Sequence, residues 1–82
     1  MVFVVIRRAW ARGRRDVYAR PFHAETVSTG QTQQEAEDRA ASLAAAYRYH
    51  RYDAEQGCWV AYNEEGPVFT FAVESERKGR GS

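Results

Sequence analysis

Few residues of this 82-residue chain have the chemistry of a catalytic or metal site. The candidates for a nucleophile, a base or a metal ligand are Cys58, His23 and His50, with scattered carboxylates. Cys58 follows a glycine and precedes Trp59 in an apolar stretch, where cysteine usually acts as a small buried hydrophobic residue. Neither histidine has a second ligand at metal spacing. We therefore predict a protein that is not an enzyme, with no metal and no cofactor; an enzyme that uses His23 or His50 is the third hypothesis.

Arginines are concentrated near the start of the chain. Residues 1–22 contain six arginines and one acidic residue, whereas residues 23–76 contain ten acidic residues and three arginines. Arginines neutralise phosphates and aromatic rings stack bases, so this segment could contact nucleic acid. The candidate contacts are Arg7, Arg12, Arg14, Arg15 and Arg20. The pI near 7.9 is below the range typical of such modules, and the acidic remainder would repel a polyanion, so nucleic-acid binding is the alternative hypothesis.

A second cluster, residues 47–52, alternates tyrosines with Arg48, His50 and Arg51. It could stack a ligand or a base. Aromatic residues and arginines at the end of a helix more often place one ring in the core and leave cation–π pairs at the surface. We expect this second arrangement.

A capping box predicts where the helix starts. Thr32 can accept a hydrogen bond from the backbone of Glu35, while the Glu35 carboxylate returns to Thr32. We expect the helix to run to about Arg48. Its predicted buried face carries mostly small residues at helical spacing: Ala36, Ala40, Leu43, Ala44 and Tyr47. Aromatic residues of the sheet must therefore supply most of the large buried area.

Alternating segments on both sides of the helix predict two β-hairpins. The first joins a strand over residues 2–10 to a second strand over about residues 16–27. Pro21 favours a sheet edge for this second strand, or makes it bend or bulge near Arg20 and Phe22. In the second hairpin, a turn over residues 63–66 places Tyr62 opposite Val68. All-antiparallel pairing then gives the strand order 2-1-3-4, and an order of 1-2-3-4 with a parallel centre remains open.

The second hairpin is apolar on both faces. The face predicted to meet the helix carries Trp59, Ala61, Phe69, Phe71 and Val73. The other face carries Cys58, Val60, Tyr62, Val68, Thr70 and Ala72. One helix cannot cover both faces, so we expect a second copy of the chain to cover the other one, or the first hairpin to curl over it. The candidate dimer interface is formed by Val60, Tyr62, Val68 and Thr70.

Composition and length complete the prediction. With 44% hydrophobic and 28% charged residues, the chain has the composition of a soluble globular domain. We predict an α+β fold: a four-stranded, mainly antiparallel sheet with one helix packed on one face (ββαββ), over residues 1–74, followed by a flexible basic tail over residues 75–82. A single cysteine favours the reducing cytoplasm. The leading hypothesis is a cytoplasmic, non-enzymatic, homodimeric binding or interaction module, with no membrane association and no assigned small-molecule ligand.

Overall fold

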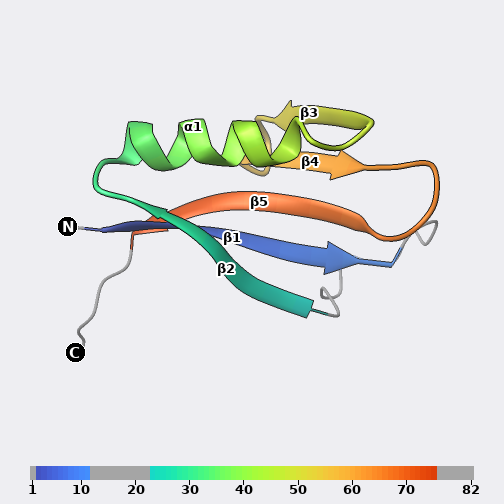
Figure 1. Ribbon diagram of the computed structural model, residues 1–82, viewed down its shortest axis with the longest axis horizontal. Coiled ribbons are helices and arrows are strands. Elements are labelled where there is room, and N and C mark those ends of the chain that lie inside the picture. Colours follow the sequence, from blue (N-terminus) through green and yellow to red (C-terminus); the bar gives the residue numbers. More distant parts are fainter. Residues whose placement is uncertain (1, 12–22, 76–82) are drawn as a thin grey trace.

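The computed structural model describes residues 2–11 and 23–75. The elements of this part are β1 (Phe3–Trp10), β2 (His23–Gly30), α1 (Gln33–Ala44), β3 (Tyr49–Asp53), β4 (Cys58–Tyr62) and β5 (Val68–Ser75). The strands form one antiparallel sheet in the order β2-β1-β5-β4-β3, and α1 packs on one face of it (Figure 1). The predicted α+β class with a single helix is confirmed. The predicted number of strands is wrong, because the sheet has five.

The additional strand, β3, lies directly after the residues that the sequence assigned to the helix, in a segment for which no element was predicted. The helix ends at Ala44, with Ala45 as its C-cap, and does not reach Arg48. The chain then turns into β3, whose residues are exposed except for Asp53 at its end. Because both sides of β3 face solvent, its sequence lacks the alternation of apolar and polar residues that reveals a half-buried strand.

The turn between β3 and β4 is built by Asp53. Its carboxylate Oδ1 accepts hydrogen bonds from the backbone nitrogens of Glu55, at 3.1 Å, and Gln56, at 3.3 Å. Gly57 adopts a φ of 70° and donates to the backbone oxygen of Asp53 at 2.7 Å. An aspartate followed by a glycine four residues later is a turn signal that could have revealed this hairpin.

The strand next to β1 is β5, in a register that runs from Phe3 opposite Ser75 to Trp10 opposite Val68. Both predicted strand orders are therefore wrong, although the edge position of β2 is confirmed. The physical reason is length: β1 and β5 have eight residues each and are apolar on both faces, whereas β4 has five. Pairing the two long strands gives the longest buried ladder at the centre of the sheet. Pro21, which motivated the edge prediction, lies outside the described residues, as do the start of the predicted second strand and residues 76–82 of the predicted tail.

The register between β4 and β5 agrees with the prediction from the turn, because Cys58 lies opposite Ala72 and Ala61 opposite Phe69. Gly66 in that turn has a φ of 96°, which suits glycine. The core between the sheet and α1 consists of buried Val5, Ala36, Ala40, Ala44, Ala61 and Phe71. Partly buried residues complete it: Phe3, Val27, Leu43, Tyr47, Trp59, Phe69 and Val73. The predicted helix face and the predicted sheet face are both confirmed.

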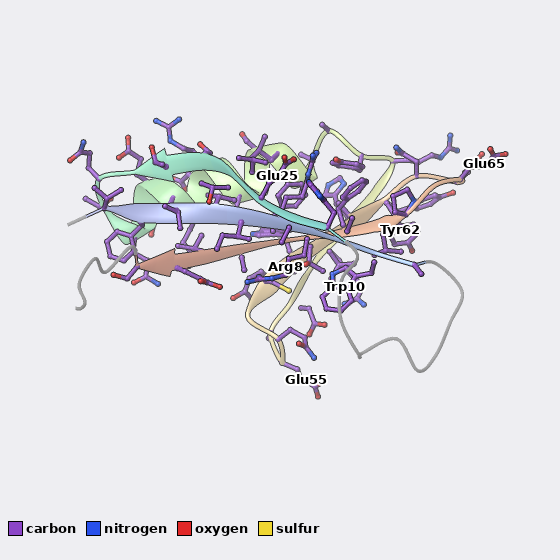
Figure 2. All side chains as sticks on the ribbon, turned by 90° about the horizontal axis from the view of Figure 1, so that it is seen from below. Arg8, Trp10, Glu25, Glu55, Tyr62 and Glu65 are labelled. Atoms are coloured by element: carbon purple, nitrogen blue, oxygen red, sulfur yellow. The ribbon has the colours of Figure 1, made fainter. Side chains whose placement is uncertain are left out.

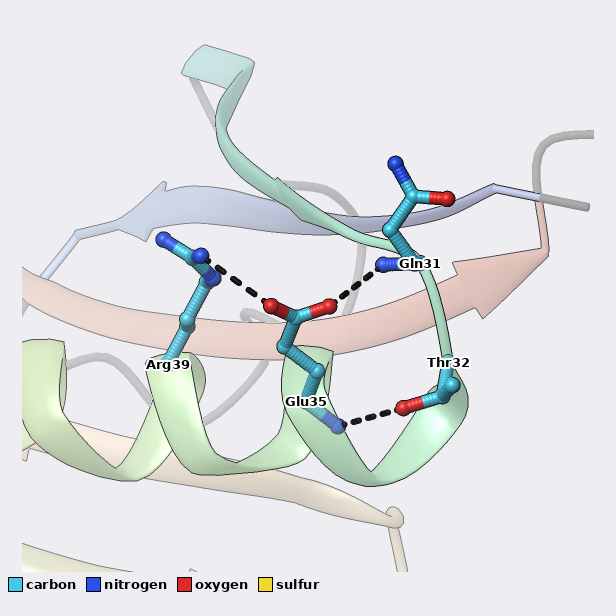
Figure 3. A network of polar contacts seen from close by, with 4 residues as sticks. All are labelled: Gln31, Thr32, Glu35 and Arg39. Atoms are coloured by element: carbon cyan, nitrogen blue, oxygen red, sulfur yellow. Dashed lines mark hydrogen bonds and ion pairs between the residues drawn. The ribbon is translucent and has the colours of Figure 1, made fainter.

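The start of α1 is fastened to the end of β2 by a small polar network (Figure 3). The Thr32 hydroxyl accepts from the Glu35 backbone nitrogen at 3.1 Å, as the capping box predicts. One carboxylate oxygen of Glu35 accepts from the Gln31 backbone nitrogen at 2.7 Å, and the other lies 3.4 Å from the Arg39 guanidinium. These contacts, with that to Gln31 first, hold the pKa of Glu35 below its ordinary value.

Candidate interaction surface

The four residues predicted to form a dimer interface lie together on the sheet face opposite α1. Val60 lies opposite Thr70, and the same register continues to Tyr62 and Val68, all of them half-buried. We call this surface the open face; on β1, β4 and β5 it consists of Val4, Ile6, Arg8, Trp10, Cys58, Val60, Tyr62, Val68, Thr70, Ala72 and Glu74. No helix or strand of residues 2–11 and 23–75 packs against it, and Figure 2 shows Arg8 and Trp10 on the side away from α1.

Trp10 joins β1 to the predicted interface. Its indole Nε1 donates a hydrogen bond to the Thr70 hydroxyl at 3.0 Å, so the polar group of the tryptophan is satisfied within the open face. The ring can then present apolar area without an unpaired donor. Trp10 is thus a candidate interface residue that was not predicted, because only the pairing of β1 with β5 places it beside Val68.

Charges on the open face are balanced. Arg8 forms an ion pair with Glu74 at 3.2 Å, and the alternation of β3 brings Arg51 and Asp53 to the same side of the sheet. Two basic and two acidic side chains on these strands leave no net charge. Within residues 2–11 and 23–75, the open face therefore has no excess of positive charge.

Cys58 is not placed to act as a nucleophile. Its side chain is buried in the open face, and burial raises the pKa of the thiol, with the nearby Asp53 carboxylate raising it further. The two histidines lie on the other side of the sheet: His23 pairs opposite Ala9 and His50 opposite Ala61. The structure therefore does not bring the cysteine and the histidines together.

Arg7, a predicted nucleic-acid contact, lies on the helix side of the sheet. Its guanidinium donates to the Glu25 carboxylate and lies 5.0 Å from the centre of the Phe69 ring. His23 Nε2 lies 3.5 Å from the same carboxylate, and both contacts, His23 first, hold the pKa of Glu25 below its ordinary value. Figure 2 shows Glu25 on this side. The charge of Arg7 is thus already paired.

The remaining predicted nucleic-acid contacts, Arg12, Arg14, Arg15 and Arg20, lie outside the described residues. The structure therefore places only the first member of that predicted group.

The cluster at residues 47–52 has the predicted arrangement. Tyr47 enters the core, with its ring centre 5.3 Å from that of Phe69, and Arg48 lies 5.6 Å above the Tyr49 ring at the surface. Tyr49 in turn stacks on Tyr62, at 5.2 Å and an interplanar angle of 24°. A shallow hollow of about 280 Å³ is lined by Arg48, Tyr49, His50, Arg51 and Tyr62. This hollow was not predicted, because it exists only where β3 lies beside β4.

Comparisons of the chain with protein-family models, with curated proteins and with solved structures found no match. Within residues 2–11 and 23–75, no three His, Cys, Asp or Glu side chains are grouped so that they could hold a metal ion. In the same part of the chain, no helix has the length and apolar character needed to cross a membrane. The case for a function therefore rests on the geometry of the surfaces.

Proposed function

We propose that this protein is a non-catalytic interaction module that forms a homodimer through its open face. The observation that carries the proposal is the open face itself: a half-buried, largely apolar surface over β1, β5 and β4 that no described element covers. A sheet with two apolar faces needs a cover on each of them, and α1 supplies one. A second copy supplies the other.

A twofold stack of two open faces suits the chemistry of this surface. In such a dimer each copy contributes the same residues, so apolar Val60 and Val68 meet apolar partners. The balanced charges of the open face allow a second copy to approach without net repulsion. The Trp10 ring, held by Thr70, is a fixed aromatic group of the kind that contributes strongly at interface centres.

The placement of the titratable groups supports a non-catalytic role. The raised pKa of Cys58 keeps its thiol protonated, and Glu25 is held as a carboxylate by Arg7 and His23. The raised pKa of Cys58 runs away from the thiolate that nucleophilic catalysis would use.

The test is the mass of the protein in solution by light scattering at micromolar concentration. We expect a dimer for the wild type and a monomer for Val60→Asp and for Val68→Asp, because either carboxylate would be buried between the two copies. Ser42→Asp, which adds the same charge at an exposed position of α1, is the control and should remain dimeric. A wild-type monomer would rule out the proposal, and circular dichroism verifies that each variant is folded.

A further inference from the structure

The two edges of the sheet differ in how well they could receive another strand. β2 contains an irregularity, because the pairing with β1 shifts between Val5 and Ile6. β3 pairs with β4 in an uninterrupted register and contains no proline. A bulge protects an edge from further pairing, whereas a regular edge directs the N–H and C=O groups of every second residue outward. Among the described residues, no strand pairs with the outer edge of β3.

The side chains of β3 are exposed on both sides of this edge. Tyr49 is 40% exposed and Tyr52 is 48% exposed, on opposite faces of the sheet. Each ring packs against an aromatic residue of β4. The ring centres of Tyr49 and Tyr62 are 5.2 Å apart, and those of Tyr52 and Trp59 are 5.4 Å apart. The two tyrosines are therefore held in place and have exposed area left to contact a neighbouring strand.

Two arginines, Arg51 on β3 and Arg48 just before it, place positive charge beside these tyrosines. Arg51 is exposed and forms no ion pair with any carboxylate of the described residues. Arg48 forms an ion pair with Glu64 at 3.6 Å, and both side chains are about two-thirds exposed, at 64% and 65%. With His50, these arginines line the hollow of about 280 Å³ beside β3. A carboxylate entering this hollow would meet arginine nitrogens, which hydrogen-bond carboxylates strongly.

We propose that β3 binds an extended acidic peptide segment by strand addition. The main chain of the peptide pairs with the outer edge of β3, its apolar side chains lie opposite Tyr49 and Tyr52, and its carboxylates lie opposite His50 and Arg51. The peptide would extend the sheet within its own plane, at the outer edge of β3, whereas a second copy would stack on the open face from above or below that plane. The two surfaces share Tyr62 and the side of β3 that carries Tyr49 and Arg51, but the outer backbone edge of β3 lies beyond the open-face residues of β1, β5 and β4, so strand addition does not require the dimer.

Charge selects this occupant over the other candidates. If β3 of a second copy paired with β3 over its full length, Arg51 would lie opposite Arg51, and like charges at paired positions are destabilising. The segments of this chain outside the described residues are basic: residues 12–22 have four basic side chains and one acidic, and residues 76–82 have three and one. A partner that carries carboxylates would place negative charge opposite the arginines beside β3, which neither a second β3 nor these basic segments would do.

The experiment is a titration with the blocked peptide Thr-Val-Glu-Glu-Val-Thr, followed through the backbone amide NMR signals of the protein. The peptide reads the same in both directions, so it tests parallel and antiparallel addition together. We expect saturable shifts that are largest over Tyr49–Asp53. We also expect much weaker binding of Thr-Val-Lys-Lys-Val-Thr, and of a peptide in which proline replaces the second valine, because proline removes a backbone donor.

The matched variants are Arg51→Glu and Arg39→Glu, which make the same change of charge on β3 and on the exposed side of α1. Arg51→Glu should weaken binding about tenfold, because it turns an attractive cross-strand pair into a repulsive one, whereas Arg39→Glu should leave binding unchanged. The proposal is overturned if there is no saturable shift at millimolar peptide, if the largest shifts fall on β2 or the open face, or if the lysine peptide binds equally well. Amide shifts of β3 that follow protein concentration without peptide would identify a second copy as the occupant, and stronger shifts with a single-stranded oligonucleotide would identify nucleic acid; either result also overturns it.

Discussion

Gly30 lies so close to α1 that a Cβ atom built on it would stand 2.8 Å from the backbone nitrogen of Ala36. Gly30 is the last residue of β2, and Ala36 is fully buried near the start of α1. The conformation of Gly30 does not require glycine, because positive φ values occur only at Gly57 and Gly66 among the described glycines. The lack of a side chain at Gly30 is therefore what allows the strand to lie against the helix.

Gly30→Ala should destabilise the protein. We expect the free energy of unfolding to fall by about 1–3 kcal/mol, the usual cost of overpacking, measured by urea denaturation. This exceeds the roughly 0.4–1 kcal/mol that alanine contributes by restricting the unfolded chain. Because the closest contact is with a backbone atom, adding Ala36→Gly should not restore stability. If the double variant recovered the wild-type free energy of unfolding, the new Cβ at position 30 would instead be crowded by the Cβ atom of Ala36.

Gly57→Ala should destabilise the protein through backbone conformation alone, without the steric crowding expected at Gly30. Nothing lies within 4 Å of a Cβ atom built at Gly57, but its φ of 70° is in the left-handed region. We expect a loss of about 1–2 kcal/mol from the conformation alone, and a smaller loss for Gly57→Asn, because asparagine adopts this region more readily. Equal losses for alanine and asparagine in urea denaturation would contradict this explanation.

Acid should remove the contribution of Glu35 to stability. Its pKa is lowered in the folded protein, so the contribution is complete above the ordinary value of 4.5 and is lost as the pH falls through the folded-state pKa. We therefore expect Glu35→Gln to lower the urea midpoint at neutral pH and the two proteins to converge at acidic pH. A difference between them that stays constant with pH would show that the Gln31 and Arg39 contacts do not depend on the charge.

The thiol of Cys58 should react slowly with iodoacetamide in the folded protein and quickly in urea. Burial both shields the sulfur and raises its pKa, which lowers the thiolate fraction at mildly alkaline pH. If the open face forms the dimer, the rate should fall further as protein concentration rises, and Val60→Asp should remove that dependence. A native rate equal to the rate in urea would place Cys58 on an accessible surface.

The alternative function has its own test in a gel-shift assay with single-stranded RNA at low salt. Since Arg7 and Arg8 are already paired with Glu25 and Glu74, we expect no salt-dependent shift. A shift that disappears in the variant with Arg12, Arg14 and Arg15 all changed to alanine would establish nucleic-acid binding. Ser42→Asp, which makes a smaller charge change on α1, serves as the control.

Local features of the fold could be predicted because neighbouring residues determine them. Thr32 and Glu35 specify the start of α1, and the turn that ends at Gly66 specifies the register of β4 and β5. The four interface candidates followed from this register together with the alternation of side chains. Each of these predictions depends on residues within one turn or one hairpin.

The features that could not be predicted depend on long-range packing or on exposed residues. The pairing of β1 with β5 joins Phe3 to Ser75, and no local signal selects it over a pairing with β4. β3 is exposed on both sides, so burial left no pattern in its sequence. The hollow beside Arg51 could not be found either, because its lining belongs to β3, to Arg48 just before it, and to Tyr62 of β4.

The position of β5 has a consequence for synthesis of the protein. β1 and β2 pair with each other, as do β3 and β4, but the two hairpins share no ladder until β5, the last strand in chain order, enters between them. Isolated hairpins are marginally stable in water. A nascent chain that has left the ribosome only as far as the residues before Val68 therefore has two hairpins that are not joined into one sheet, and the apolar side chains that β5 covers stay accessible to chaperones until that strand emerges.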